Sequence, residues 1–509
     1  MKRNKLIGLA SLTAILLVPM SCKEDFLEQK NTQGITEESL FKKPNDGIAL
    51  VTGIYDTFHN VDFITKAMWY QANFLSQDFK NYGADTFFET YEVPTTFAPL
   101  DLFWSRAYQG IARANSAVPI IARMKADKIL PDALADRLTG ETLFLRGVFY
   151  YYLASNFGGV PLELQTVTDD GRHPRNTQDE VFKSVAADMK TAADLLPWAQ
   201  DLASVDVGRA SKGAALAYLG DAQMWLKQYG EAAATFEKLT GKYQLESNFL
   251  NIHEFNNQNG KESIFEVQFI ASPDMSWGHP NDSHWMSTFG MPEEITQFGY
   301  SYADKRFYDS FEPGDTRKAP TVIGPGDEHP SPAIHIKDYP LVKQNWGGIN
   351  TLGTVEKPWK GNDKGRSGYY SVKTWRDPNA TGRSTSPPYI FSGQNLVVMR
   401  YGQVLLSKAE ALFKSGNSAG ALDIINNQIR KRAGLAPAKG TDVMKILLAE
   451  YRHELAGEFS LWYMLRRSGE QINYVRDTYG ITVPPGKDLM PIPAKQIAIN
   501  EKLVQNPGY

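Results

Sequence analysis

Apolar residues recur at three- and four-residue spacings along much of the chain, which is the periodicity of amphipathic helices. The first such stretch covers residues 40–58, and a longer series of stripes covers residues 101–240. Within that series the pattern predicts one helix over residues 181–196, which Pro197 ends because proline cannot continue a helix. Another helix is predicted over residues 210–226. The hydrophobic pattern therefore predicts a mainly α protein.

Two segments share one internal arrangement: a helix rich in small residues, a short turn that contains glycine, and a second helix rich in alanine. The first copy turns at Gly230 and the second turns at Gly416. Alanine lets paired helices approach closely, so the arrangement resembles degenerate tetratricopeptide repeats. We expect a tetratricopeptide-like helical repeat scaffold over about residues 101–240 and 396–470.

Residues 241–395, between the two copies, break the helical pattern. Alternating apolar and polar positions predict one half-buried strand over residues 263–269. The rest is rich in glycine, proline, asparagine and aspartate, with isolated aromatic residues. A loop region of this length inside a compact protein is usually functional or disordered, and its aromatic content argues against disorder. We therefore predict a loop-rich, aromatic-rich insertion that carries little β structure.

The N-terminus has a basic patch followed by a short apolar run, which together indicate a signal peptide over residues 1–21. The run is too short to span a bilayer, which requires about 20 helical residues. It ends beside Cys22, the only cysteine in the sequence. A small residue before a cysteine is typical of the site where a bacterial lipoprotein is cleaved and acylated, so we predict lipidation at Cys22 and a tether over residues 22–39. An ordinary secretory signal with an idle cysteine is the alternative.

Composition and motifs narrow the functional classes. A formal net charge of −3 argues against the basic surface that neutralises nucleic-acid phosphates, so we expect no nucleic-acid partner. The chain has no nucleophile-elbow, P-loop or dinucleotide-binding motif. Glu293 and Glu294 would form a glycosidase pair only if they faced each other across a sugar ring, and sequence neighbours rarely do. We therefore expect no enzymatic activity, no cofactor and no metal.

Short motifs that occur in a fixed order cover nearly the whole chain. They are Cys22 to Glu28; Trp104, Tyr108, Ile111 and Asn115; Gly140 to Arg146; Phe157 to Leu162; Gly208 to Ala215; Glu262 to Phe265; Gly314 to Arg317; Arg400 to Ala411; Ile425 to Gly434; Met490 to Pro493; and Gln505 to Tyr509. The ordered set resembles the SusD/RagB family of surface nutrient-binding lipoproteins. Residues 450–463 depart from the family's charge pattern, and we interpret them as variation within a structural helix pair whose charges satisfy one another.

The resemblance implies a location and a role for residues 40–509 as a single SusD-like domain. Such proteins are lipid-anchored in the outer membrane, exposed on the cell surface, and cover a SusC-like TonB-dependent transporter. They capture an oligosaccharide, or less often a peptide, and pass it to the transporter without catalysis. The triplet Lys23-Glu24-Asp25 resembles the acidic export signal of surface lipoproteins, with a generic solvated tether as the alternative.

The resemblance also indicates that ligand binds to the stretch before the first repeat helix and to the insertion. The candidate ligand-binding residues are Asp78, Asn81, Tyr82, Trp277, Trp285, Tyr300 and Trp346. A flat aromatic ring can cover the apolar face of a pyranose while polar side chains bond to its hydroxyl rim. The alternative for each candidate is a core or loop-anchoring role, which we predict for Trp104 and Trp225 because both lie on helical stripes.

Two other functions remain open. The same architecture can capture a peptide or glycopeptide instead of a glycan. Repeat proteins also bind other proteins along their concave surfaces, so the chain is alternatively a repeat-based interaction or structural lipoprotein. Binding of a purified glycan or peptide would distinguish nutrient capture from the scaffold role.

Overall fold

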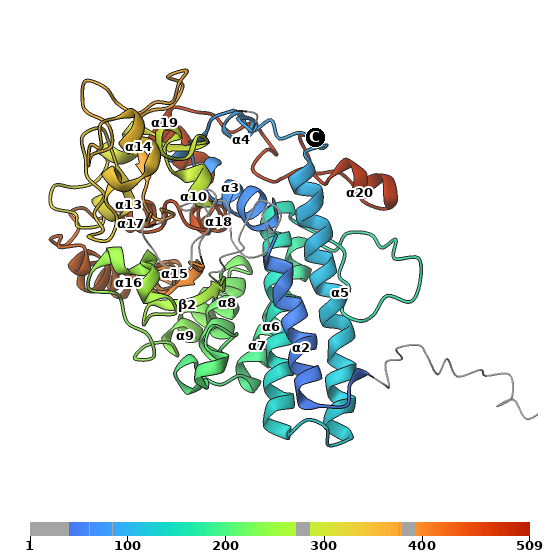
Figure 1. Cartoon of the computed structure of the whole chain (residues 1–509). Helices are drawn as coiled ribbons and strands as arrows, with labels where there is room; N and C mark the ends of the chain where they lie inside the picture. Colours follow the sequence, from blue (N-terminus) through green and yellow to red (C-terminus); the bar gives the residue numbers. More distant parts are fainter. Residues whose placement is uncertain (1–39, 61, 84, 271–285, 376, 379–392) are drawn as a thin grey trace, which may run out of the picture.

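The computed structural model describes residues 40–60, 62–83, 85–270, 286–375, 377–378 and 393–509. The predicted lipidation residue Cys22 and the predicted ligand residues Trp277 and Trp285 lie outside these ranges. Within them the protein is mainly α, as the hydrophobic pattern predicts (Figure 1). The principal helices are α2 (Pro44–Tyr55), α5 (Ala98–Ala126), α6 (Asp132–Phe157), α7 (Gln178–Leu195), α8 (Lys212–Trp225), α9 (Tyr229–Glu237), α15 (Tyr401–Lys414), α16 (Ser418–Ile424) and α17 (Val443–Leu455).

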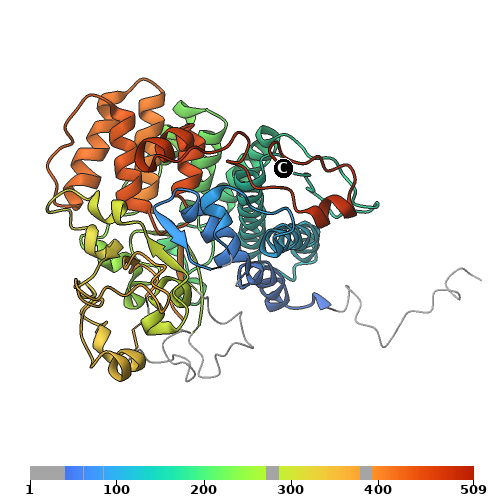
Figure 2. The same cartoon turned by 90° about the horizontal axis from the view of Figure 1, so that it is seen from above.

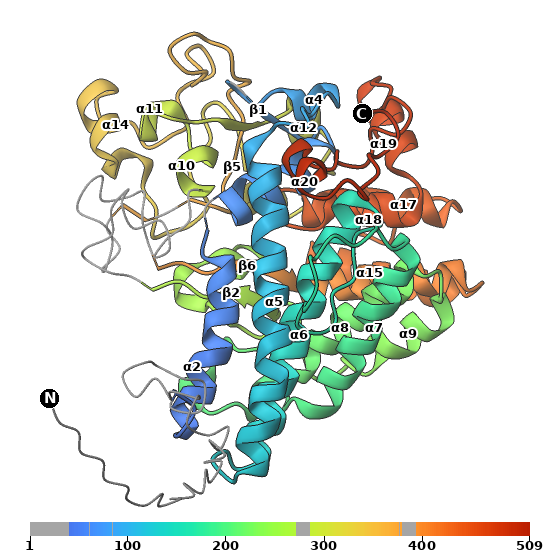
Figure 3. The same ribbon diagram turned by 90° about the vertical axis from the view of Figure 1, so that its right-hand side faces the viewer.

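These helices form a continuous stack in which α5 contacts α6, α6 contacts α7, and α7 contacts α8. The pair α8 and α9 is the first predicted repeat, and α15 and α16 form the second. Helix α9 packs directly on α15, so the two repeats are neighbours in space although the insertion separates them in the sequence (Figure 3). This stack is the tetratricopeptide-like scaffold that the sequence predicts.

The two helices of the first repeat approach closely at Gly220. A Cβ atom at this position would lie 2.5 Å from the ring of Phe236 on α9, so a larger residue would push the helices apart. Trp104 is buried on its helical stripe, as predicted. Trp225 is partly buried and stacks on Phe182 with the ring centroids 4.9 Å apart.

Capping fixes the start of α7. The Thr177 hydroxyl accepts a hydrogen bond from the Glu180 backbone N–H, and the Glu180 carboxylate accepts one from the Thr177 N–H at 2.7 Å. This capping box satisfies two backbone donors that a helix N-terminus otherwise leaves unpaired. Helix α7 therefore begins three residues before the position predicted from hydrophobic periodicity, and it ends just before Pro197, as predicted.

The strands of the described residues form three two-stranded antiparallel ribbons. Strand β2 (Ser263–Val267) is the strand predicted in the insertion, and it pairs with β6 (Leu396–Arg400) at the entry to the second repeat. Strand β1 (Phe79–Asn81) pairs with β3 (Ser301–Ala303), which joins the segment before α5 to the insertion. The third ribbon lies within the insertion and consists of β4 (Val322–Ile323) and β5 (Tyr370–Ser371).

The insertion has a small hydrophobic core of its own, built around Tyr339, Trp359 and Tyr370. Figure 2 shows it as the yellow and gold part of the chain, to one side of the helical stack. Its short helices are α10 (Met286–Gly290), α11 (Glu293–Thr296), α12 (Lys305–Asp309), α13 (Lys318–Thr321) and α14 (Pro340–Asn345). Short helices with little strand agree with the loop-rich insertion that the sequence predicts.

Six further helices lie around the segment before α5 and near the C-terminus. They are the π-helix η3 (Asp62–Trp69), α3 (Tyr70–Phe74), α4 (Phe87–Thr90), α18 (Leu461–Ser468), α19 (Gln471–Tyr479) and α20 (Ala494–Ile499). Helix α18 packs against α3, and α20 packs against α5. In the described part of the chain, no helix combines the length and the apolar character that crossing a membrane requires.

The segment that departs from the family's charge pattern forms a buried ionic network. Arg400, fully buried, donates to Glu454 at 2.7 Å and to Glu458 at 2.8 Å. Lys373 of the insertion also pairs with Glu458 at 2.6 Å. These charges satisfy one another, as the sequence interpretation predicts, and they tie the second repeat to the insertion. Burial makes each carboxylate depend on its cations, because an unpaired charge is costly away from water.

Candidate ligand-binding cleft

A cavity of about 940 Å³ opens on the insertion. Its volume lies within the range of about 300–1,000 Å³ that small-molecule sites occupy. Helices α11 and α14 and the loop of residues 356–364 form its walls. Figure 3 shows α11 and α14 at the same end of the molecule as β1. The lining residues are Glu293, Glu294, Gln297, Leu341, Asn345, Trp346, Glu356, Lys357, Pro358, Lys360, Gly361, Asn362 and Lys364.

Trp346 is the aromatic residue of this cleft. It follows α14, and its backbone N–H donates to the carbonyl of Val342 at 3.0 Å, which fixes the end of the helix. Its ring packs against Trp359, with the centroids 5.4 Å apart. Trp359 is fully buried, whereas Trp346 is only partly buried. The insertion core therefore supports the Trp346 ring while part of that ring remains accessible at the cleft.

An arginine connects the cleft to the segment before α5. Arg366 pairs with Glu293 of the cleft wall at 2.7 Å and donates to the carbonyl of Gly299 at 2.9 Å. Its guanidinium carbon lies 3.9 Å from the centroid of the Tyr82 ring. A Cβ atom on Gly365 would lie 2.4 Å from the same ring, so glycine allows this loop to lie close to Tyr82. Arg366 therefore lies between Tyr82 and the Glu293 carboxylate of the cleft and contacts both.

The β1–β3 ribbon sets the positions of the other predicted residues. The Tyr82 N–H donates to the Tyr300 carbonyl at 2.6 Å, directly beyond the paired residues Asn81 and Ser301. Tyr300 is partly exposed, and its ring contacts that of Phe298 at a centroid distance of 6.0 Å. Asn81 is buried, and its N–H donates to the Glu89 carboxylate. The structure thus brings Tyr82 and Tyr300 together, while the Asn81 side chain of β1 is buried.

Asp78 has a different environment from the one expected of a ligand-binding residue. Its side chain is fully buried and accepts hydrogen bonds from Arg452 Nε at 2.7 Å, from the Tyr474 hydroxyl at 2.6 Å and from the Tyr479 hydroxyl. These donors occupy both carboxylate oxygens. We therefore assign Asp78 to the scaffold, where it fixes the start of β1 against α17 and α19.

Several polar groups of the cleft were not among the predicted ligand residues. Glu294 Oε1 accepts a hydrogen bond from the Gly361 N–H at 2.9 Å. Burial raises the pKa of the Glu294 carboxyl group, and the negative charge of neighbouring Glu293 raises it further. Lys357, Lys360 and Lys364 line the same cleft. The sequence offers only a weak signal for them, a three- to four-residue spacing of lysines in a short loop that contains Gly361 and Asn362. Only the folded loop places them beside Trp346.

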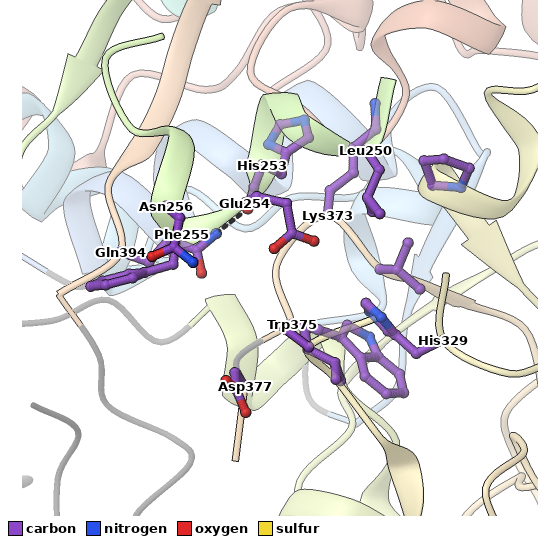
Figure 4. A pocket seen from close by; sticks show the side chains of 14 residues that line it. Leu250, His253, Glu254, Phe255, Asn256, His329, Lys373, Trp375, Asp377 and Gln394 are labelled. Carbon is purple, nitrogen blue, oxygen red and sulfur yellow. Dashed lines mark hydrogen bonds between the residues drawn. The ribbon is translucent and has the colours of Figure 1, made fainter. Parts of the chain in front are cut away.

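A second cavity of about 210 Å³ lies between residues 250–256 and residues 372–375, which follow β5 (Figure 4). The His329 ring stacks on Trp375 with centroids 5.0 Å apart, and burial lowers the pKa of His329 to about 3. The Glu254 carboxylate projects into the cavity in Figure 4. This volume is below the usual range for a ligand site. We therefore place the candidate site in the larger cleft.

Two family models cover most of the chain. Residues 25–223 match a model described as starch-binding associating with outer membrane. Residues 241–509, more than half of the chain, match the model of the SusD family. The chain belongs to the SusD family. Two curated relatives of this SusD-family protein come from Formosa agariphila: SusD-like protein P2 is 24% identical, and SusD-like protein P38 is 25% identical, each over the full length of both chains.

Solved structures share the fold. A SusD homolog from Bacteroides thetaiotaomicron matches with a TM-score of 0.74 and 20% identity, covering 93% of this chain and 98% of that chain. A laminarin binding SusD-like protein matches with a TM-score of 0.73 and 23% identity, covering 92% and 100%. The surface glycan-binding protein A from Bacteroides thetaiotaomicron, solved in complex with laminarihexaose, matches with a TM-score of 0.72 and 19% identity, covering 91% and 99%. At these identities the likeness establishes the fold.

Proposed function

We propose that this SusD-family protein captures an oligosaccharide at the cell surface and delivers it to a partner TonB-dependent transporter of the outer membrane. The cleft beside Trp346 is the observation that carries the proposal, because it combines a supported, partly exposed aromatic ring with polar side chains. Glycan ligands named for two proteins of the same fold, laminarin and laminarihexaose, support the ligand class. The proposed role is binding and transfer, without turnover of the glycan.

The cleft matches the two surfaces of a pyranose ring. The indole of Trp346 covers the apolar C–H face, and the exposed side chains of Gln297 and Asn362 bond to the hydroxyl rim. An aromatic side chain buries about 150–250 Å², so covering half of it contributes roughly 2–3 kcal/mol gross at about 25 cal/mol/Å². Ordering and desolvation offset part of this gain, and the expected dissociation constant is about micromolar to millimolar. Weak binding suits a protein that must release its ligand to a transporter.

The proposal places the mature protein on the outer membrane, held by acyl chains on Cys22. Its support is the signal-like N-terminus and the description of the model that residues 25–223 match, which names association with the outer membrane. Each buried methylene of an acyl chain contributes about 0.8 kcal/mol, so two or more chains anchor a protein stably. The predicted tether of residues 22–39 would then join the anchor to the domain that carries the cleft.

Affinity electrophoresis and calorimetry with a panel of oligosaccharides test the capture role. We expect at least one glycan to bind and Trp346→Ala to weaken that binding by about tenfold or more, which is the loss expected from removing about 1.4 kcal/mol or more of contact. Trp198→Ala is the matched control, because Trp198 is a partly exposed tryptophan on the helical scaffold. If the wild type and Trp346→Ala bind the glycan with equal affinity, the glycan does not bind in this cleft.

The delivery role needs a separate test with the lipidated, full-length protein. A tagged transporter encoded beside this protein should co-purify it from outer membranes in mild detergent. Uptake of the glycan by whole cells should require both proteins. Normal uptake in a strain that lacks this protein would contradict the delivery role while leaving glycan binding intact.

A further inference from the structure

We propose that the oligosaccharide bound in the Trp346 cleft is anionic, carrying carboxylate or sulfate groups that Lys357, Lys360 and Lys364 recognise. This inference rests on the proposed function and specifies its substrate class. It follows from the distribution of charge around the cleft.

The three lysines are concentrated on one wall. They lie within eight residues of one loop, and all of them line the cleft that contains Trp346. Lys357 and Lys364 are exposed, and Lys360 is partly exposed. Among the residues that the structure describes, no ion pair or hydrogen bond engages any of their ammonium groups. Three ammonium groups without a protein partner at one site are available to a ligand.

The carboxylates of the cleft do not neutralise these lysines. Glu293 is paired with Arg366 at 2.7 Å and accepts a hydrogen bond from the Asn362 side chain at 2.7 Å. Glu294 is directed to the Gly361 N–H. Its second carboxylate oxygen is buried and faces neither solvent nor the lysines' ammonium groups as a hydrogen-bond partner. Glu356 is the one lining carboxylate that remains exposed, against three lysines.

The charge of the whole chain makes the local excess of cations significant. The net charge is −3, so a positive wall is opposite in sign to the molecule as a whole. The loop of residues 356–364 carries three lysines against Glu356 and Asp363, and a wall with an excess of one charge concentrates ions of the other sign. The effect extends over about 8 Å at physiological ionic strength, which covers a sugar unit bound against Trp346 and the substituents on it. A neutral glycan can accept hydrogen bonds from the three ammonium groups, but it lacks the charge–charge attraction that an anionic glycan adds.

The test uses three probes of similar length with the mature protein: oligogalacturonate, a sulfated galactan oligomer and neutral laminarin. We expect the two charged probes to bind about tenfold or more tightly than laminarin, and this advantage to shrink by about tenfold between about 50 and 500 mM NaCl, because salt screens exposed charges. The triple variant Lys357→Gln, Lys360→Gln, Lys364→Gln should lose the advantage. The corresponding Lys→Arg variant should keep it, because arginine retains the charge.

The matched control removes three exposed lysines from the scaffold, Lys183, Lys190 and Lys238, and should leave the preference unchanged. Laminarin that binds as tightly as the charged probes would overturn the inference, and loss of that binding in Trp346→Ala would preserve the proposed function. A charged-probe preference that survives the cleft-lysine variant would also overturn it. Failure of every glycan to bind would instead reject the proposed function.

Discussion

The guanidinium of Arg366 lies over the ring of Tyr82, with 3.9 Å between its carbon and the ring centroid. Arg366 belongs to the insertion, and Tyr82 follows β1 in the segment before α5. The same guanidinium pairs with Glu293 in the cleft wall. The two parts of the sequence in which ligand residues were predicted are therefore joined by one buried cation. This contact makes Arg366 a positioning residue for the cleft.

Arg366→Gln should weaken glycan binding and destabilise the insertion. The substitution removes the cation from Glu293 and from the face of Tyr82, and truncating one partner of a buried charge pair costs about 2–5 kcal/mol. Calorimetry with the bound glycan and urea unfolding measure the two effects. Arg172→Gln is the control, because its pair with Glu501 at 3.5 Å is solvent-exposed. If the folded Arg366→Gln variant binds the glycan with unchanged affinity, Arg366 is not a positioning residue for the cleft.

Asp78→Asn should lower the free energy of unfolding without a specific effect on ligand recognition. The buried carboxylate is bound by Arg452, Tyr474 and Tyr479, and breaking a buried ion pair typically costs about 3–5 kcal/mol. Chemical denaturation provides the measurement. Asp136→Asn, which breaks the exposed pair with Lys125, should cost about 1 kcal/mol or less. Equal losses in the two variants would contradict the assigned role of Asp78.

Gly220→Ala and Gly230→Ala should have opposite effects on stability. A methyl group at Gly220 would overlap the Phe236 ring, and overpacking of a core costs about 1–3 kcal/mol. At Gly230 an added Cβ meets no atom within 4 Å, so alanine should stabilise helix α9 by up to about 1 kcal/mol. Thermal and urea unfolding of both variants test the prediction. Destabilisation by Gly230→Ala would show that the first turn of α9 requires glycine for another reason.

The loop that contains His173 should lose stability as the pH rises. His173 donates hydrogen bonds to Glu163 and, at 2.9 Å, to Asp169, and these interactions raise its pKa to about 9. The unfolded chain has a histidine pKa near about 6.5. Because the pKa of His173 is higher in the folded state than in the unfolded chain, its protonation stabilises the folded state fully below about pH 6.5. This contribution disappears as the pH rises from about 6.5 to about 9.

Two measurements check this pH dependence. NMR titration should give His173 a pKa about two units above that of a free histidine. The difference in melting temperature between the wild type and His173→Gln should shrink across the same pH window. A difference that grows with pH would mean that the neutral imidazole, and not the imidazolium, stabilises the loop.

Cys22→Ala should release the protein from membranes. If Cys22 is the acylated residue, the wild type will incorporate radiolabelled palmitate and sediment with outer membranes, and the variant will do neither, because its acyl chains are absent. Glycan binding by the purified variant should be unchanged. Palmitate incorporation into Cys22→Ala would place the modification elsewhere.

The hydrophobic pattern predicted the helices well, because each repeat helix buries one continuous stripe and that stripe is visible in the sequence. The bounds of α7 and α8 lie within three residues of the predicted ones. Gly416 lies in the turn of the second repeat, as predicted, whereas Gly230 is the second residue of α9 and the first turn lies at residues 226–228. Local sequence carried this information, since helix periodicity, capping and turns depend on near neighbours.

The site was less predictable, because it depends on contacts between distant segments. Aromatic content alone could not distinguish Trp346, which lies at the cleft, from Trp359, which supports it from the core. A carboxylate such as Asp78 looked suitable for a ligand until the fold surrounded it with Arg452 and two tyrosines. The pairing of Arg366 with Glu293, which engages that carboxylate away from the cleft lysines, has no local signature.

The sequence by itself determined the family, the helical scaffold and the position of the predicted anchor residue Cys22, because these depend on periodicity and on ordered local motifs. The tertiary structure decided which aromatic and charged side chains lie together at the cleft. Burial is the physical reason: whether a charge or a ring is available to a ligand depends on what the folded chain places against it.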